Sequence, residues 1–119
     1  PDDLPAAALR RVVPPGFIIG ASVGSDAEIV LARDADYVGI GPLYETASKP
    51  DAGRAIGPVG FSRLARSCRV PAVAIGGIDA TNAATAVMAG AAGVAVIRAV
   101  MGASDPERAA RAIREAMGL

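Results

Sequence analysis

The chain has 119 residues and no net formal charge, and 52% of its residues are apolar while only 3% are aromatic. A core of Ala, Val, Ile and Leu is typical of helices packed on parallel strands. The balanced charge, without a basic cluster or an aromatic platform, argues against nucleic-acid binding. No run of about 18 apolar residues and no charged-then-apolar leader occurs, so we expect a protein without a membrane segment.

A helix is expected from Leu4 to Val12, ending before the Pro14-Pro15 pair. Four apolar runs follow, and none alternates polar with apolar residues, so each is expected to be a strand buried on both faces. These runs are Phe17–Ala21, Tyr37–Ile40, Ala72–Ile75 and Val94–Ile97. A helical pattern follows each of them, marked by residues 27–31, 61–68, 84–91 and 109–116. Pro106 suits the first turn of the last helix, with Ser104 or Asp105 as its cap.

Two helix-to-strand junctions, residues 32–40 and 88–96, resemble each other, as expected when one β-α unit is reused. Four β-α units form either a small open sheet or half of a barrel. A complete barrel needs about 250 residues, so this chain would supply roughly half of one. No linker divides the chain, and residues 1–119 are expected to form a single unit.

The rare residue types exclude several kinds of chemistry. The lone Cys68 excludes an internal disulfide and a multi-cysteine zinc site, and it favours the reducing cytoplasm as the location. Histidine is absent, which excludes Ser-His and Cys-His catalysis and histidine metal sites. Lys49 is the single lysine beside eleven arginines. Either it has a specific role or it is an incidental surface residue.

Ligands of parallel α/β folds bind on the loops that follow the strands. Three such loops are short, residues 22–25, 76–79 and 98–104, and the fourth, residues 41–57, is long. The long loop carries Thr46, Ser48 and Lys49, and it is either a binding loop or a surface excursion. Gly76-Gly77, placed before Asp79 as an expected helix cap, suits either a phosphate or a simple tight turn.

Two further charged positions are candidates for binding a ligand or a metal ion. Arg98 closes the last expected strand and is either a phosphate clamp or part of a salt bridge at the rim. Asp2-Asp3 stands at the start of the chain. These carboxylates are either magnesium ligands or the cap of the first helix.

Together, several segments resemble thiamine phosphate synthase from end to end and in order. They are Asp2-Asp3-Leu4-Pro5, Ile19-Gly-Ala-Ser22, Asp36-Tyr-Val-Gly-Ile-Gly-Pro42, Thr46-Ala-Ser-Lys-Pro-Asp-Ala-Gly53 and Ala74-Ile-Gly-Gly-Ile78. The resemblance implies an α/β fold, a TIM (β/α)8 barrel, of which this chain covers strands 5 to 8 with their helices. It implies an enzyme that joins hydroxymethylpyrimidine pyrophosphate to thiazole phosphate and gives thiamine phosphate and pyrophosphate.

The resemblance also implies roles for individual residues. Asp3 matches a magnesium ligand, and Ser22 matches a serine near the pyrophosphate and the pyrimidine carbon. Lys49 matches the lysine that grips the pyrophosphate. The thiazole phosphate would be held by the hydroxyls of Thr46 and Ser48 and by groups of Gly77, Ile97 and Arg98.

The sequence departs from the family pattern in three ways. Pro1 stands where the family has Gln, and Arg98 stands where it commonly has Ser. The N-terminal half of the family, with its basic residues and much of the pyrimidine pocket, is absent. The isolated chain is therefore expected to be catalytically incomplete, and its partners would be the two small-molecule substrates and either an N-terminal half-barrel or further copies of itself.

Two alternatives stay open. A thiazole tautomerase is the first, favoured by Tyr44-Glu45-Thr46 and Ser22-Val23-Gly24-Ser25. That enzyme has a catalytic histidine at the position of Gly24, and the absence of histidine counts against it. The second is a non-catalytic phosphate-binding half-barrel, whose open strand edges would need to be covered.

Overall fold

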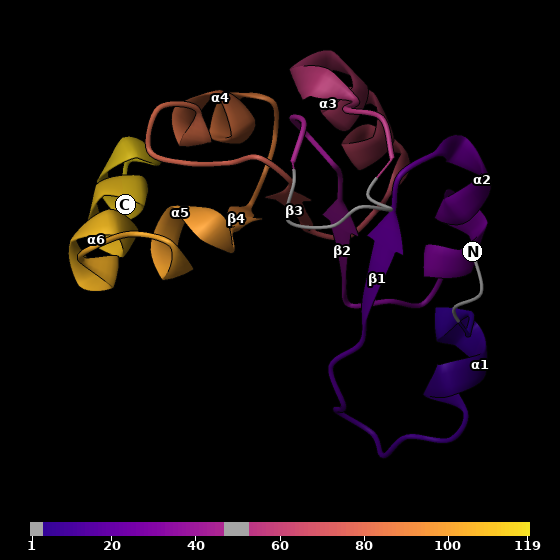
Figure 1. Cartoon of the computed structure of the whole chain (residues 1–119). Helices are drawn as coiled ribbons and strands as arrows, with labels where there is room; N and C mark the ends of the chain where they lie inside the picture. The colour runs from indigo at the N-terminus through magenta and orange to yellow at the C-terminus, as the bar shows by residue number, and fades with distance from the viewer. Residues whose placement is uncertain (1–3, 47–52) are drawn as a thin grey trace.

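The computed structural model describes residues 4–46 and 53–119, and within them it contains one parallel sheet of four strands (Figure 1). The strands lie in chain order: β1 Gly20–Val23, β2 Tyr37–Ile40, β3 Ala72–Ile75 and β4 Gly93–Ala95. Their register pairs Ser22 with Gly39 and Ile75 with Ala95, so the carboxyl ends of all four strands meet at one edge. The predicted α/β class with a parallel sheet is confirmed, and the bounds predicted for β2 and β3 are those observed.

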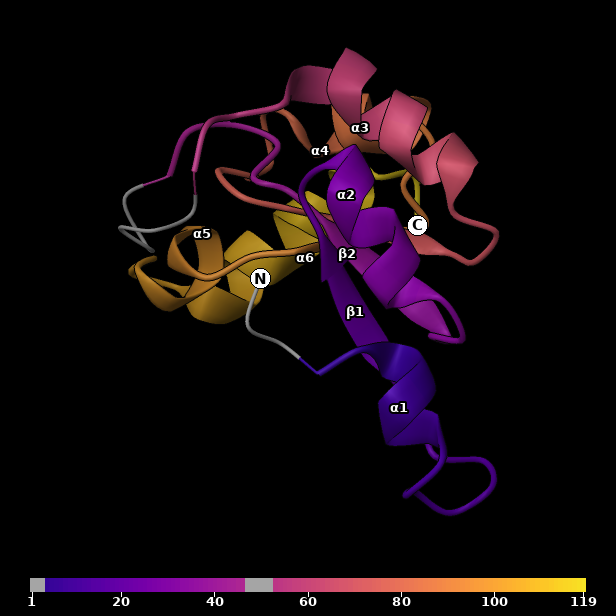
Figure 2. The ribbon, with the colours of Figure 1, turned by 90° about the vertical axis from the view of Figure 1, so that its right-hand side faces the viewer.

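The helices are α1 Ala6–Arg10, α2 Asp26–Ile29 continued by the 3-10 turn η1 Val30–Ala32, α3 Gly57–Ser67, α4 Ala83–Met88, α5 Arg98–Met101 and α6 Pro106–Ala116. Figures 1 and 2 show that α2, α3 and α4 follow one another around the outside of the sheet, with α5 and α6 beyond β4. The predicted cap of α6 is confirmed, because the Asp105 carboxylate accepts a hydrogen bond from the backbone N–H of Arg108 at 3.1 Å. In the described parts of the chain, no helix is long and apolar enough to cross a membrane.

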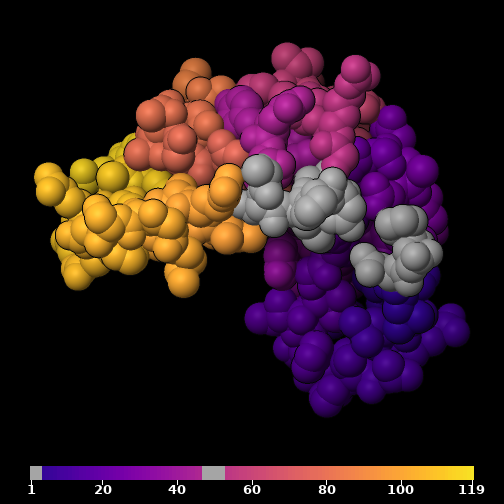
Figure 3. Space-filling model, viewed as in Figure 1, coloured from indigo at the N-terminus to yellow at the C-terminus, as the bar shows by residue number. Residues whose placement is uncertain are grey.

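The core lies between the sheet and its outer helices. Val38, Ile40 and Phe61 are fully buried there. On the opposite face of the sheet, Tyr37 is 41% and Ile75 is 40% exposed. The prediction that the strands are buried on both faces is therefore wrong for the described residues, because the helices cover only one face. Figure 3 shows a wide hollow between the orange-yellow region of α5 and α6 and the indigo region of α1.

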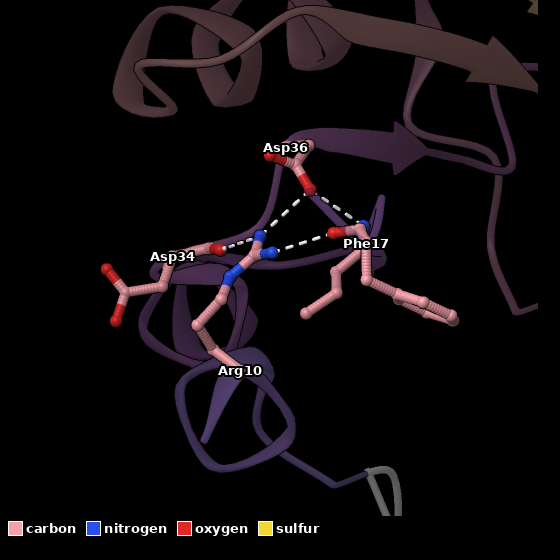
Figure 4. Close-up of polar contacts among 5 residues, drawn as sticks. Arg10, Phe17, Asp34 and Asp36 are labelled. Atoms are coloured by element: carbon pink, nitrogen blue, oxygen red, sulfur yellow. Dashed lines mark hydrogen bonds and ion pairs between the residues drawn. The ribbon is translucent and has the colours of Figure 1, made fainter. Parts of the chain in front are cut away.

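Helix α1 is held against the amino ends of β1 and β2 by Arg10 (Figure 4). Its guanidinium donates to the carbonyls of Phe17 at 2.7 Å and Asp34 at 2.9 Å, and to the Asp36 carboxylate at 2.8 Å. The same carboxylate accepts from the backbone N–H of Ile19 at 2.7 Å. These bonds from Arg10 and Ile19 lower the pKa of Asp36 below its ordinary value.

This anchor explains why the first strand begins later than predicted. Phe17 bonds to Arg10 and Ile19 bonds to Asp36, and the strand starts only at Gly20. The first helix is likewise shorter than its predicted range of Leu4 to Val12. At the other end of the sheet, β4 stops at Ala95, because Ile97 already caps α5. The predicted loop over residues 98–104 is thus wrong, since helix α5 begins at Arg98.

The predicted repeat of a helix-to-strand junction is confirmed. Asp34 and Gly90 occupy the same place in the two junctions, and both have positive φ, 70° and 109°. Two residues later, the backbone N–H of Asp36 donates to the carbonyl of Ile19 at 2.7 Å, and that of Ala92 donates to the carbonyl of Ala72 at 2.8 Å. Each junction therefore joins its incoming strand to the preceding strand in the same way.

Candidate functional site

Ser22 lies at the carboxyl edge of the sheet on the face that the helices leave open. It is exposed, whereas the next residue, Val23, is 1% exposed and belongs to the core. Its register partner on β2 is Gly39, which has no side chain to cover it. The Ser22 hydroxyl is therefore accessible from the open face, as a substrate-contacting residue requires.

The first residues of the long loop are hydrogen-bonded to the end of β3 and to the last described part of the loop. The backbone N–H groups of Leu43 and Tyr44 donate to the carbonyls of Ile75 at 2.8 Å and Gly76 at 3.0 Å, which extends the pairing between β2 and β3. The N–H of Ile56 returns to the carbonyl of Pro42 at 3.0 Å. The predicted long connection between β2 and α3 is confirmed at both of its described ends, of which the first is bonded to β3 and the second to the first. Of its three predicted site residues, Thr46 is described, while Ser48 and Lys49 lie outside the described residues.

Gly76 and Gly77 follow β3 where the long loop approaches most closely. Both have positive φ, 103° and 67°, a conformation that favours glycine. A Cβ on Gly77 would lie 2.7 Å from the carbonyl oxygen of Glu45 and 2.8 Å from the Cβ of Tyr44. No described residue accepts a hydrogen bond from the backbone N–H of Gly77. The pair thus makes a tight turn at the carboxyl edge of the sheet, and the N–H of Gly77 has no acceptor among the described residues.

Asp79 does not cap the following helix, which corrects the prediction. Its carboxylate accepts bonds from the backbone N–H and the hydroxyl of Thr81, and these bonds lower its pKa. The helix begins only at Ala83, with Asn82 as its N-cap residue. The Asn82 side chain donates to the carbonyl of Gly77 at 3.0 Å and accepts from the N–H of Asp79 at 2.9 Å. Asn82 therefore secures the turn that carries Gly77.

The sequence analysis did not single out Asn82. Asparagine is a good helix-capping residue, and its place just before Ala83 is the signal that was available. The helix that it starts has six residues and begins at Ala83, later than a cap at Asp79 would have placed it.

Ile97 and Arg98 are the N-cap and the first residue of α5, at the end of the strand that neighbours β3. Both are exposed, with Ile97 at 58%. Within the part of the chain that the structure describes, Arg98 forms no salt bridge, so the predicted rim salt bridge is not observed there.

The described residues contain no group of three His, Cys, Asp or Glu side chains that could hold a metal ion. Asp3, the predicted magnesium ligand, lies outside the described residues. A groove between α3 and α4, lined by Val59, Arg66 and Met88 among others, contains none of the predicted site residues. The candidate site is therefore the carboxyl edge of the sheet.

Comparisons with known proteins identify the family to which the chain belongs. The sequence model of the family described as thiamine monophosphate synthase matches residues 1–100. A thiamine biosynthesis bifunctional protein of Symbiobacterium thermophilum is 53% identical over 94% of this chain and 24% of its own length. The thiamine-phosphate synthase of Methanoculleus marisnigri is 50% identical over 96% of this chain and 55% of its own length.

The structural comparison gives the same family. The thiamine phosphate pyrophosphorylase of Pyrococcus furiosus superposes with a TM-score of 0.86 and 40% identity, over 99% of this chain and 56% of that chain. The chain thus spans about half the length of the single-function relatives that it matches. On the extent of the sequence match and the agreement of the fold, the chain belongs to the thiamine monophosphate synthase family.

Proposed function

We propose that this chain is the strand 5 to 8 half of a TIM barrel and that the complete barrel synthesises thiamine phosphate. The substrates would be hydroxymethylpyrimidine pyrophosphate and thiazole phosphate, and the second product would be pyrophosphate. The observation that carries the proposal is the shared position of the predicted residues. Ser22, Thr46, Gly77 and Arg98 follow or end four successive parallel strands, and so they occupy one edge of one sheet.

The reaction that we propose exchanges one bond for another at a single carbon. The carbon–oxygen bond between the pyrimidine methylene and the pyrophosphate breaks, and its electron pair leaves with the pyrophosphate. The thiazole nitrogen supplies its lone pair to the same carbon. No proton has to be removed, so the absence of histidine is compatible with the chemistry.

In this proposal the protein stabilises the negative charge that grows on the departing pyrophosphate. Lys49, the single lysine, would contact that group from the long loop. Ser22 would contact it from β1, where the hydroxyl is exposed on the open face. The described start of this loop is bonded to β3 through Leu43, and its described end returns to Pro42 through Ile56.

The thiazole phosphate would bind between the last two strands and the long loop. Support comes from the N–H of Gly77, which has no acceptor among the described residues, and from the exposed position of Arg98 at the end of the neighbouring strand. Thr46 and Ser48 would add hydroxyl donors, and backbone groups of Ile97 would complete the contacts. Arg98 can offer paired donors to a phosphate, which a serine at this position could not.

Magnesium is proposed as the cofactor, with Asp3 as one ligand. A carboxylate oxygen is the kind of ligand that magnesium prefers, but the described residues supply no further cluster for it. The remaining ligands would have to come from outside the described part of this chain. When bound, the ion would supply positive charge to the pyrophosphate.

The partner that we propose is an N-terminal half-barrel, either preceding this segment or supplied by another chain. Strands β1 and β4 are the edges of the described sheet, and the face opposite its helices carries half-exposed Tyr37 and Ile75. Four additional β-α units would pair both edges and cover this face. The length of the relatives, about twice that of the chain, agrees with this arrangement.

The test is to assay synthesis of thiamine phosphate and release of pyrophosphate from both substrates with magnesium. The chain is assayed alone and as part of a complete barrel with a family N-terminal half. We expect product only from the complete barrel. No product from a correctly folded complete barrel would refute the function, and product from the isolated chain would refute the proposal that its site is incomplete.

A further inference from the structure

Glu28 forms the side-chain hydrogen bonds of the turn after β1. It occupies the third position of α2, and its Oε1 accepts bonds from the backbone N–H of Gly24 and the hydroxyl of Ser25, both at 3.2 Å. A glutamate at this helix position ordinarily reaches the N–H of the N-cap residue. Here the N-cap residue is Ser25, but the Glu28 carboxylate bonds the backbone N–H of Gly24, one residue earlier. It thereby closes the turn.

The turn that Glu28 closes is tightly packed against the start of the long loop. A Cβ on Gly24 would lie 3.1 Å from the carbonyl oxygen of Gly41 and 3.3 Å from Oε1 of Glu28. The N–H of Gly41 donates to the carbonyl of Val23 at 3.4 Å. A Cβ on Gly41 would in turn overlap the carbonyl of Ile75. Three successive strand ends therefore touch through their backbones, and Glu28 is the side chain that supports the first of them.

The helix that carries Glu28 cannot hold the turn without side-chain help. Helix α2 has four residues before it tightens into η1, and such short helices are marginal. Ser22 lies only two residues before Gly24, so a displacement of the turn would move its hydroxyl relative to Gly41 and the long loop. Small displacements of positioned groups reduce turnover by as much as about 100-fold.

We propose that Glu28 is a positioning residue for the reaction, which sets the placement of Ser22 relative to the long loop through the turn at Gly24. The inference rests on the proposed function. The geometry requires an oxygen acceptor rather than a charge, because both bonds use the same oxygen, Oε1. A glutamine side chain offers an amide oxygen at the same place.

The test compares Glu28→Ala with Glu28→Gln in the complete barrel. For Glu28→Ala we expect kcat to fall by about ten- to a hundredfold, with a much smaller change in KM for either substrate. Glu28→Gln is expected to restore kcat to within about threefold of the unaltered protein, because it keeps the acceptor. Amide hydrogen exchange at Gly24 is measured in the same proteins, and it should accelerate in Glu28→Ala only.

Asp26→Ala is the matched control. It removes the same charge from the same helix, but Asp26 pairs with Arg63 at 2.7 Å through two well-exposed side chains and does not contact the turn. Its kcat and Gly24 exchange should be unchanged. Equal losses in Glu28→Ala and Glu28→Gln would overturn the inference in favour of charge. Unchanged kcat or unchanged Gly24 exchange in Glu28→Ala would also overturn it.

A failure of the proposed function is recognised separately. In that case the unaltered complete barrel makes no thiamine phosphate, and Glu28 could then have no role in that reaction. The exchange of Gly24 would still show whether Glu28 holds the turn.

Discussion

Replacing Gly77 with alanine tests whether the long loop and the β3 turn are as closely packed as the structure shows. At φ 67° alanine carries a backbone penalty of about 1–2 kcal/mol. Its new Cβ would also lie 2.7 Å from the carbonyl oxygen of Glu45 and 2.8 Å from the Cβ of Tyr44. Both contacts are too short, so the loop has to move.

Gly16→Ala is the control that isolates this crowding. Gly16 has a similar φ of 83°, and a Cβ there meets no atom of the described residues within 4 Å. The backbone penalty and the stiffening of the unfolded chain are shared by the two variants and cancel in their difference. The difference between the free energies of unfolding of the two variants is then the cost of overpacking at Gly77, about 1–3 kcal/mol.

The assay is urea unfolding of the complete barrel, followed by circular dichroism. With a urea dependence of about 1–3 kcal/mol per molar, Gly77→Ala should unfold at least about 0.3 M earlier than Gly16→Ala. The KM for thiazole phosphate should rise in Gly77→Ala and stay constant in Gly16→Ala, because only Gly77 lies at the ligand edge. Equal midpoints would refute the close packing, and equal KM values would refute the placement of the phosphate.

Three further predictions concern the loop, the α1 anchor and the core. Lys49→Ala should reduce turnover at least tenfold and leave the urea midpoint unchanged, since the sequence predicts a loop there; normal turnover would refute its role. Asp36→Asn should lower the urea midpoint at pH 7, because the bonds from Arg10 and Ile19 favour the charged carboxylate. As its folded pKa is lowered, this stability is present above about pH 4 and is lost as the pH falls through the folded value. The difference between the two midpoints should therefore shrink as the pH falls below the ordinary pKa of aspartate, and a constant difference would contradict the linkage. Phe61→Ala should destabilise the fold by about 3–5 kcal/mol, because the ring is fully buried. A loss below about 1 kcal/mol by urea unfolding would show that the ring is not packed as described.

Local patterns were sufficient for much of the fold. The apolar runs at Tyr37–Ile40 and Ala72–Ile75 are strands with those bounds, because central strands of a parallel sheet consist of little except apolar residues. Asp105 caps α6 as predicted, since capping involves residues only three positions apart. The similarity of residues 32–40 to residues 88–96 correctly indicated a repeated junction.

Predictions at the ends of the sheet were less accurate, because long-range bonds decide where those strands begin and end. Residues 17–19 are apolar enough for a strand, yet Arg10 bonds the carbonyl of Phe17 and Asp36 bonds the N–H of Ile19. Asp79 has the chemistry of a cap, but Thr81 occupies its carboxylate and the helix starts later, after Asn82. The bonds of Arg10 and Asp36 join segments apart in sequence, whereas the partners of Asp79 lie within three residues of it and could have been found locally.

The sequence by itself determined the parallel α/β class, the order of strands and helices, and which residue types stand at the strand ends. Only the tertiary structure decided how those ends meet. It brought Gly77 against Tyr44 and Glu45, and it set the Gly24 turn, held by Glu28, against Gly41. Helix and strand signals arise from neighbours in sequence, whereas these contacts join different loops. Their positions depend on sheet register and backbone packing, which no single segment encodes.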